Sequence, residues 1–328
     1  MTDYPKGMLP AVARHMEIFT PHALRRMLEI EKKQTRFVHY TSADVGLKII
    51  TTRQIWMRQA SCMNDYSEIQ HGLECLRRAW HGSHGQRLQA FLNGLFPGVV
   101  KEITDSFDAF NNALRFDTYV TSLSEHAPSP EHADEDRFGR LSMWRAYGGD
   151  VGVALVVKQD PFWTTDQSLG LFSTPVAYLD EEAFETEFGA IVTTMEANAE
   201  FLKQIGKDWT RHSVVMAFSS AAVATKHPGF REEREWRIVR TPNFPLPCPL
   251  EKSVQTIRGV PQSVLLLALK DRPPGLTGIE PAALLDRVII GPTAYPMPIY
   301  STYIAALAEV GVTDASSKVK ISFLPLRT

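Results

Sequence analysis

A late segment of the chain places two glutamates, Glu233 and Glu235, two residues apart among arginines. If residues 233–240 form a strand, the two carboxylates project to the same face, because the side-chain period of a strand is two. Arg237 then shares that face, and Trp236 takes the opposite, buried one. One carboxylate could hold a substrate hydroxyl while the other positions or deprotonates an acceptor, and their repulsion would raise one pKa.

Three further polar segments lie at predicted strand ends or turns and could complete a site with the glutamates. They are residues 39–41 (HYT), residues 63–68 (MNDYSE), and residues 122–125 (SLSE) joined with residues 143–147 (MWRAY). The members of these segments with polar or aromatic groups suited to a site are His39, Tyr40, Thr41, Asn64, Asp65, Ser124, Trp144 and Tyr147.

Each segment also has a structural interpretation that stays open. A histidine at a strand end, such as His39, is more often a hydrogen-bonding structural residue than a catalyst. Residues 64–65 are typical of a turn and helix cap. Trp144 and Tyr147, three residues apart, could form the inner face of a short helix. Residues 231–237 could be a salt-bridged, exposed edge strand.

The elements that must position these residues are short strands interspersed with helices, as apolar periodicity indicates. Strands are expected at about 36–40, 54–58, 117–125, 151–157, 172–178, 235–240, 254–257, 264–269, 287–290 and 319–324. Helices are expected at about 21–33, 43–52, 66–80, 86–114 with a break at 96–98, 141–147, 180–225 with a break near Gly206, and 298–310. Residues 126–138 lack apolar periodicity and predict a mobile loop. The pattern predicts an α+β fold, because strict strand–helix alternation is missing.

Length and composition favour one domain over residues 1–328, with 44% hydrophobic and 22% charged residues. Its core would span about 36–291, with a helical insertion at about 180–225 and a terminal helix and strand at about 298–324. Three cysteines without zinc spacing predict a reduced protein. The start of the sequence lacks a signal-peptide pattern, and no apolar run reaches ~18 residues, so we expect a cytoplasmic protein without a membrane partner.

Several chemistries are disfavoured by the sequence. No glycine-rich nucleotide fingerprint, HExxH zinc motif or GxSxG nucleophile elbow occurs. His81 and His84 lie in a Gly-Ser loop without a nearby carboxylate, so a metal site is not expected. The net charge of −2 does not call for nucleic acid, although a local basic groove stays possible.

Taken together, the segments resemble a widespread bacterial family known as domain of unknown function 2971. The shared pattern is an HYT strand, a helix, an MNDxxE turn, a strand ending in SE, an MWxxY helix and an ExEWR strand. These occur in that order between residue 37 and about residue 291, where residues 289–292 (IIGP) also fit. The family name implies no activity.

A second resemblance, to the mono-ADP-ribosyltransferase fold, does imply an activity. His39, Ser124 and Glu235 follow the order of that fold's first-strand, middle-strand and late-strand site residues. Residues 233–235 also resemble the ExE of its arginine-modifying branch. The resemblance implies NAD as a substrate, mixed short-stranded sheets and helical insertions. It also implies a role as a toxin or antiviral defence effector, with a macromolecular or small-molecule acceptor that the sequence does not name.

That resemblance assigns roles residue by residue. Cleaving the nicotinamide–ribose bond develops an oxocarbenium-like charge, which Glu235 would stabilise through the ribose 2-hydroxyl while Glu233 serves the acceptor. The expected NAD-binding residues are His39, Tyr40, Thr41 and Ser124. Trp144 or Tyr147 would stack on the nicotinamide ring, and Arg53 or Arg237 would meet the pyrophosphate. The alternative from another class is a non-catalytic module that binds a nucleotide or a partner.

Overall fold

The structure, a computed structural model, describes residues 4–5, 7–63, 67–164, 166–257 and 259–325. The strands are β1 (Arg36–Ser42), β2 (Gln54–Gln59), β3 (Tyr119–His126), β4 (Gly152–Val157), β5 (Phe172–Pro175), β6 (Ala177–Tyr178), β7 (Thr225–Lys226), β8 (Glu235–Arg240), β9 (Glu251–Ile257), β10 (Val260–Ala268), β11 (Leu285–Ile290) and β12 (Val319–Ile321). The predicted mixture of helices and strands is confirmed.

Helices surround these strands. The α-helices are α1 (Pro10–Phe19), α2 (Pro21–Lys33), α3 (Ala43–Thr52), α4 (Ser67–His81), α5 (Ser83–Leu95), α6 (Val99–Phe116), α7 (Glu135–Phe138), α8 (Leu141–Tyr147), α9 (Glu181–Ala197), α10 (Ala199–Ala224), α11 (Pro281–Leu284), α12 (Pro296–Glu309) and α13 (Ala315–Lys318). The short 3-10 helices are η1 (Ala60–Cys62), η2 (Pro130–His132), η3 (Asp160–Trp163) and η4 (Pro228–Glu233). None of the described helices has the length and apolarity that crossing a bilayer requires.

The strands of the described residues form one ten-stranded mixed sheet and a separate parallel pair, β6 with β7. The main path runs β12-β11-β4-β1-β3-β2-β10-β9, and β8 joins it by pairing with β3 on one side and β5 on the other. β11 and β12 are parallel, whereas the other pairs in this sheet are antiparallel. β3 therefore contacts β1 and β2 at its two ends and β8 along its length.

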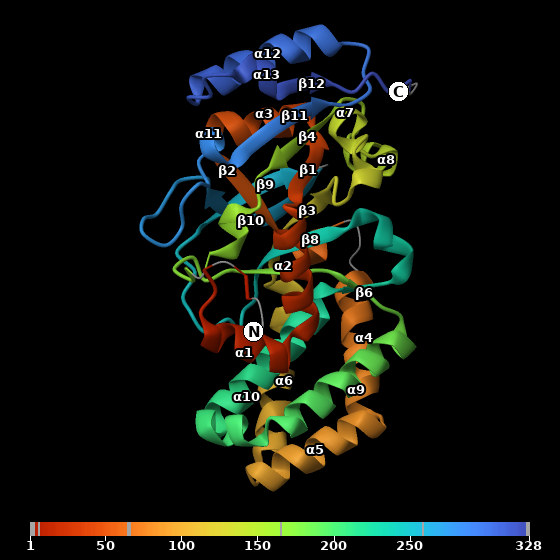
Figure 1. Cartoon of the computed structure of the whole chain (residues 1–328), viewed down its shortest axis with the longest axis vertical. Coiled ribbons are helices and arrows are strands. Elements are labelled where there is room, and N and C mark those ends of the chain that lie inside the picture. The colour runs from red at the N-terminus through yellow and green to blue at the C-terminus, as the bar shows by residue number, and fades with distance from the viewer. Residues whose placement is uncertain (1–3, 6, 64–66, 165, 258, 326–328) are drawn as a thin grey trace.

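Strand β4 is buried on both faces, as its continuous apolar sequence predicts. Val153 and Leu155 belong to a core shared with α3 and α12, whereas Ala154 and Val156 pack on the side of α8. This part of the sheet is thus enclosed between these two layers, with α12 and α13 at the end of the molecule farthest from α5, α9 and α10 (Figure 1).

The other long helices form a lobe of their own, made of α1, α4, α5, α6, α9 and α10 (Figure 1). Its core combines residues from three parts of the chain, among them Phe19, Leu92 and Phe218. The stretch predicted as a helical insertion at 180–225 therefore packs with residues 67–116 and not alone. Gly206, where we predicted a break, has non-helical angles (φ 81°, ψ 172°) within α10.

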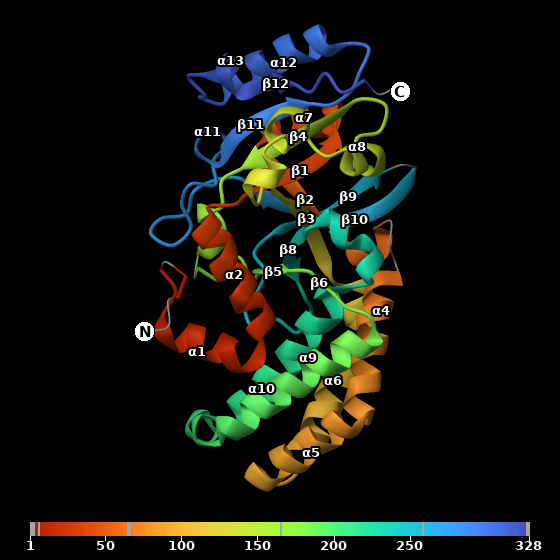
Figure 2. The same cartoon turned by 45° about the vertical axis from the view of Figure 1, so that its right-hand side comes forward.

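One local prediction is wrong, and one helix was not predicted. Residues 126–138, predicted as a loop, contain η2 and α7, and both His126 and Glu135 are buried. His126 shares a hydrogen bond with Asp136 through Nε2 at 2.9 Å, and Glu135 pairs with Arg234. Helix α1 was not predicted, since its burial depends on helices of the lobe that are distant in the sequence. From α1, helix α2 leads towards β1 (Figure 2).

Candidate functional site

Three neighbouring strands bring the predicted segments together at the centre of the molecule (Figure 1). β3 lies between β1 and β8, with Val38 opposite Ser124 and Ser124 opposite Glu235. Directly opposed residues share a face of a sheet. Val38 packs with Trp144 of α8, so all three side chains lie on the face that α8 covers. The strand order thus joins the first, middle and late motifs.

The paired glutamates meet, but not through the alternation of a strand. Glu233 is the last residue of η4, Arg234 has left-handed backbone angles (φ 45°, ψ 50°), and Glu235 begins β8. The prediction that Glu233 and Glu235 share one extended strand is therefore wrong. Their carboxylates converge because the ammonium of Lys226 lies 2.6 Å from Glu233 Oε2 and 3.1 Å from Glu235 Oε2.

Glu235 is only 6% exposed, and two further side chains hold its carboxylate. The Ser122 hydroxyl donates to Oε1 at 2.5 Å, and Arg237 donates from Nε to Oε1 at 2.7 Å and from Nη2 to Oε2 at 3.0 Å. Burial alone would raise the pKa of Glu235, but the charges of Arg237 and Lys226 and these hydrogen bonds lower it to about 2. For Glu235 this is opposite to the increase predicted from carboxylate repulsion, so it is a fixed anion near neutral pH.

Glu233 is the more accessible carboxylate, with 17% of its side chain exposed. Tyr147 Oη donates to Glu233 Oε1 at 2.9 Å. Burial and the negative charge of Glu233 raise the pKa of Tyr147 well above its ordinary value, so the phenol stays a donor. We call the following residues the charged cluster: Ser122, Tyr147, Lys226, Glu233, Glu235 and Arg237.

Lys226 was missed by sequence reasoning, and Ser122 lay in a predicted segment but was not chosen as a site residue. The predicted Ser124 donates to the backbone carbonyl of Glu233 and accepts from Arg140, so it anchors the chain around η4 and not a carboxylate. Ser122 and Ser124 are two residues apart and lie on the same face of β3. The strand period therefore cannot predict which of the two hydroxyls contacts a carboxylate. Lys226 follows an apolar helix and carries no local signal of its role.

Arg237, predicted to meet a pyrophosphate, is buried. Besides its bonds to Glu235 it donates to the Val223 carbonyl at 2.5 Å. Its guanidinium therefore balances charge inside the protein, where a pyrophosphate has no direct approach to it in this arrangement.

His39 reaches the charged cluster indirectly. Its Nδ1 lies 2.9 Å from the Ser122 carbonyl oxygen, at the point where the pairing of β1 with β3 ends. Alternation places His39 on the face opposite to Val38, and therefore opposite to Glu235. Burial lowers the pKa of His39, partly offset by the bond to Ser122, so the ring is neutral at pH 7. Ser122 is the link, bonding His39 through its backbone and Glu235 through its side chain.

Tyr40, Thr41 and Trp144 lie outside the charged cluster. The Tyr40 hydroxyl accepts from the Arg140 amide at 2.8 Å, and its ring packs edge-on against Trp144 with centroids 4.8 Å apart. Trp144 is 4% exposed and donates to the Phe138 carbonyl at 2.8 Å, so neither face is open for stacking on a ligand. Half-buried Thr41 pairs with Val153 of β4. Asn64 and Asp65 of the predicted turn lie outside the described residues.

Comparison with known proteins agrees with the motif pattern over part of the chain. Residues 143–238 match the family model described as a protein of unknown function (DUF2971), which confirms the predicted resemblance to this family over that segment. The segment runs from α8 to β8 and therefore includes all of the charged cluster except Ser122. No curated protein and no solved structure matches the chain. Among the described residues, no group of three His, Cys, Asp or Glu side chains is placed to hold a metal ion.

Proposed function

We propose that this protein, whose residues 143–238 carry the DUF2971 match, is an NAD-dependent enzyme of the ADP-ribosyltransferase type. One observation supports the proposal most. Two carboxylates, Glu233 and Glu235, are held by a single buried ammonium, and the outer one is partly exposed beside the phenol of Tyr147. The first, middle and late strands of the expected core are also neighbours, β1-β3-β8.

The roles of the two carboxylates follow from their surroundings. Breaking the nicotinamide–ribose bond leaves positive charge on the sugar, and an anion close to a ribose hydroxyl stabilises it. Glu233 suits this role, because its carboxylate is reachable and Tyr147 fixes its orientation. Glu235 suits a positioning role, since its bonds to Lys226 and Arg237 keep it inside the protein. Glu233 thus takes the ribose-binding role that the resemblance assigned to Glu235.

NAD would be bound through residues at the exposed edge of the charged cluster. Glu233 could accept from a ribose hydroxyl, and Tyr147 could contact the ring that leaves. Nicotinamide departs with the electron pair of the broken bond, and the acceptor nucleophile bonds to the ribose carbon and loses a proton. A protein of this kind would act as a toxin or defence effector on an acceptor still to be identified.

Nicotinamide release from NAD tests the proposal directly. We expect the native protein to release nicotinamide, and Glu233→Gln to lower the rate by roughly 100-fold or more, because one preorganised charge is lost. Glu232→Gln is the matched control, since its side chain is the exposed neighbour and should leave the rate unchanged. Equal rates for native protein and Glu233→Gln, with both folded by circular dichroism, would overturn the assignment.

A second candidate is a non-catalytic nucleotide-binding module. It is favoured by the burial and full ion pairing of Glu235 and by the sheet that separates His39 from it. For this function we expect calorimetry to detect NAD binding and Glu233→Gln to weaken it. Nicotinamide release should be no faster than in buffer. Measuring binding and release on the same samples separates the two functions.

A further inference from the structure

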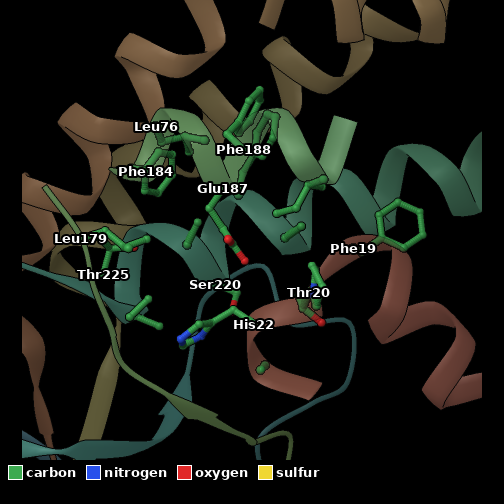
Figure 3. A pocket seen from close by; sticks show the side chains of 18 of the residues that line it. Phe19, Thr20, His22, Leu76, Leu179, Phe184, Glu187, Phe188, Ser220 and Thr225 are labelled. Carbon is green, nitrogen blue, oxygen red and sulfur yellow. The ribbon is translucent and has the colours of Figure 1, made fainter. Parts of the chain in front are cut away.

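A second site lies in the helical lobe. A cavity of about 120 Å³ opens where the start of α2 and strands β5 to β7 meet α4, α9 and α10 (Figure 3). Its unfilled space is about 850 Å³ when the opening to solvent is included. Pockets of small-molecule sites typically measure ~300–1,000 Å³, so the enclosed cavity is small and suits a narrow apolar segment of a ligand whose remainder extends through the opening.

The inner wall of the cavity is apolar. Phe184 and Phe188 of α9 line it with Phe19 of α1, Leu76 of α4 and Leu179, the residue after β6 (Figure 3). The lining helices belong to a well-packed core, in which an unfilled apolar space loses dispersion contacts. An apolar chain that enters the cavity would restore those contacts, and its own surface would be removed from water.

A few polar side chains also line the cavity, although most of its lining is apolar. Glu187, His22 and Ser220 approach one another there (Figure 3). Glu187 Oε1 is already paired with Arg25 Nη2 at 2.5 Å, and burial and the Arg25 charge lower the pKa of His22, so its ring is neutral at pH 7. Within the part of the chain that the structure describes, neither His22 nor the Ser220 hydroxyl makes a side-chain hydrogen bond.

We propose that this cavity binds a small amphiphile with an apolar chain and an uncharged, hydroxyl-bearing head. The chain would occupy the space between the phenylalanines. A hydroxyl head could donate a hydrogen bond to Glu187 and accept one from Ser220 or His22. The His22 ring or the Ser220 hydroxyl would then gain a hydrogen-bond partner. A carboxylate or ammonium head is disfavoured, because the Arg25–Glu187 pair offers no net charge to neutralise it.

The site is distinct from the charged cluster, although it adjoins it. Thr225 lines the cavity, and the next residue is Lys226, whose ammonium points to the glutamates. Thr174 of β5 also lines the cavity and lies opposite Arg237 in the sheet. The inference therefore does not depend on NAD chemistry and stands or falls on ligand binding alone.

The experiment uses the uncharged fluorescent probe N-phenyl-1-naphthylamine and its displacement by amphiphiles below their micelle-forming concentrations. We expect probe fluorescence to rise on binding, and monodecanoylglycerol to displace the probe at least tenfold more effectively than decanoate or decylammonium. Displacement by a charged amphiphile that equals or exceeds that of monodecanoylglycerol would overturn the head-group assignment. Failure of the probe to bind the native protein would overturn the site.

Two variants locate the binding. Ala221→Phe fills the cavity and should weaken probe binding at least tenfold, whereas Ala190→Phe places the same ring on the exposed side of α9 and should leave binding unchanged. Ser220→Ala keeps the cavity and should weaken monodecanoylglycerol roughly fivefold, as loss of one hydrogen bond does. Circular dichroism verifies folding. Native-like binding by both Ala221→Phe and Ser220→Ala, or equal loss in Ala190→Phe, would overturn the proposal.

Discussion

The ammonium of Lys226 lies 2.6 Å from Glu233 Oε2 and joins β7 to the end of η4, seven residues later. The same ammonium lies 3.1 Å from Glu235 Oε2, and its side chain is only 2% exposed. A buried cation that serves two carboxylates is costly to remove, because both anions stay behind in a medium that solvates them poorly. The stability of the site and any chemistry at Glu233 therefore depend on Lys226.

Replacing Lys226 with methionine keeps the length of the side chain and removes its charge. We expect Lys226→Met to lower the free energy of unfolding by about 3–5 kcal/mol, the usual cost of breaking a buried ion pair. Lys203→Met is the matched control, because Lys203 and its partner Glu200 are exposed and such pairs contribute only about 0–1 kcal/mol. Urea denaturation at pH 7 measures both, and similar losses for the two variants would contradict the expectation.

The pKa of Glu235 makes stability depend on acid pH. Its folded value of about 2 lies below the ordinary value of 4.5, so its contribution is present above pH 4.5 and is lost as pH falls towards 2. The difference of about 2.5 pH units corresponds to about 3 kcal/mol, since one unit is worth ~1.36 kcal/mol. We expect the unfolding free energy of native protein to fall between pH 5 and pH 2.5 more steeply than that of Glu235→Gln.

Urea titrations at several pH values in that window measure the slope. Glu309→Gln serves as the control. Glu309 is exposed at the end of α12, so this substitution removes a carboxylate without changing the charged cluster. A slope for Glu235→Gln that equals the native slope would show that this carboxylate is not held by its ion pairs.

A double-mutant cycle can measure how much the hydrogen bond from Tyr147 to Glu233 contributes to stability. We expect Tyr147→Phe to lower the unfolding free energy by about 1–2 kcal/mol, because a partly exposed hydrogen bond to a carboxylate is lost. In Glu233→Gln the same change should cost about 1 kcal/mol less, which is the coupling between the two side chains. Urea denaturation of the four proteins measures it, and strictly additive losses would mean that the bond contributes nothing.

Replacing Trp144 tests whether the MWxxY motif stabilises the fold or contacts a ligand. Trp144→Ala should lower the unfolding free energy by about 3–5 kcal/mol, the usual cost of deleting a buried aromatic ring. Trp209→Ala is the control, because 67% of Trp209 is exposed and its loss should cost less than about 1 kcal/mol. Chemical denaturation compares the two, and equal losses would contradict the packing role of Trp144.

Local sequence patterns predicted most elements but not their partners. The helices at 43–52 and 141–147 and the strand at 235–240 have the bounds that periodicity predicts. Periodicity also predicted that Trp236 is buried. It could not predict that Glu235 and Arg237 are buried too, because that depends on Lys226 and Ser122, which come from other elements.

The sequence by itself determined the order of the motifs, the α+β character and the presence of two glutamates near one late strand. The motif order and the glutamates are read directly from the residues. Local side-chain sterics and apolar spacing, which act over a few residues, are sufficient to predict the helices and strands. Only the tertiary structure decided that Arg234 turns the chain between Glu233 and Glu235, and that Lys226 brings their carboxylates together. It also decided that His39 and Glu235 lie on opposite faces of the sheet, because strand pairing sets faces across residues that are far apart in sequence.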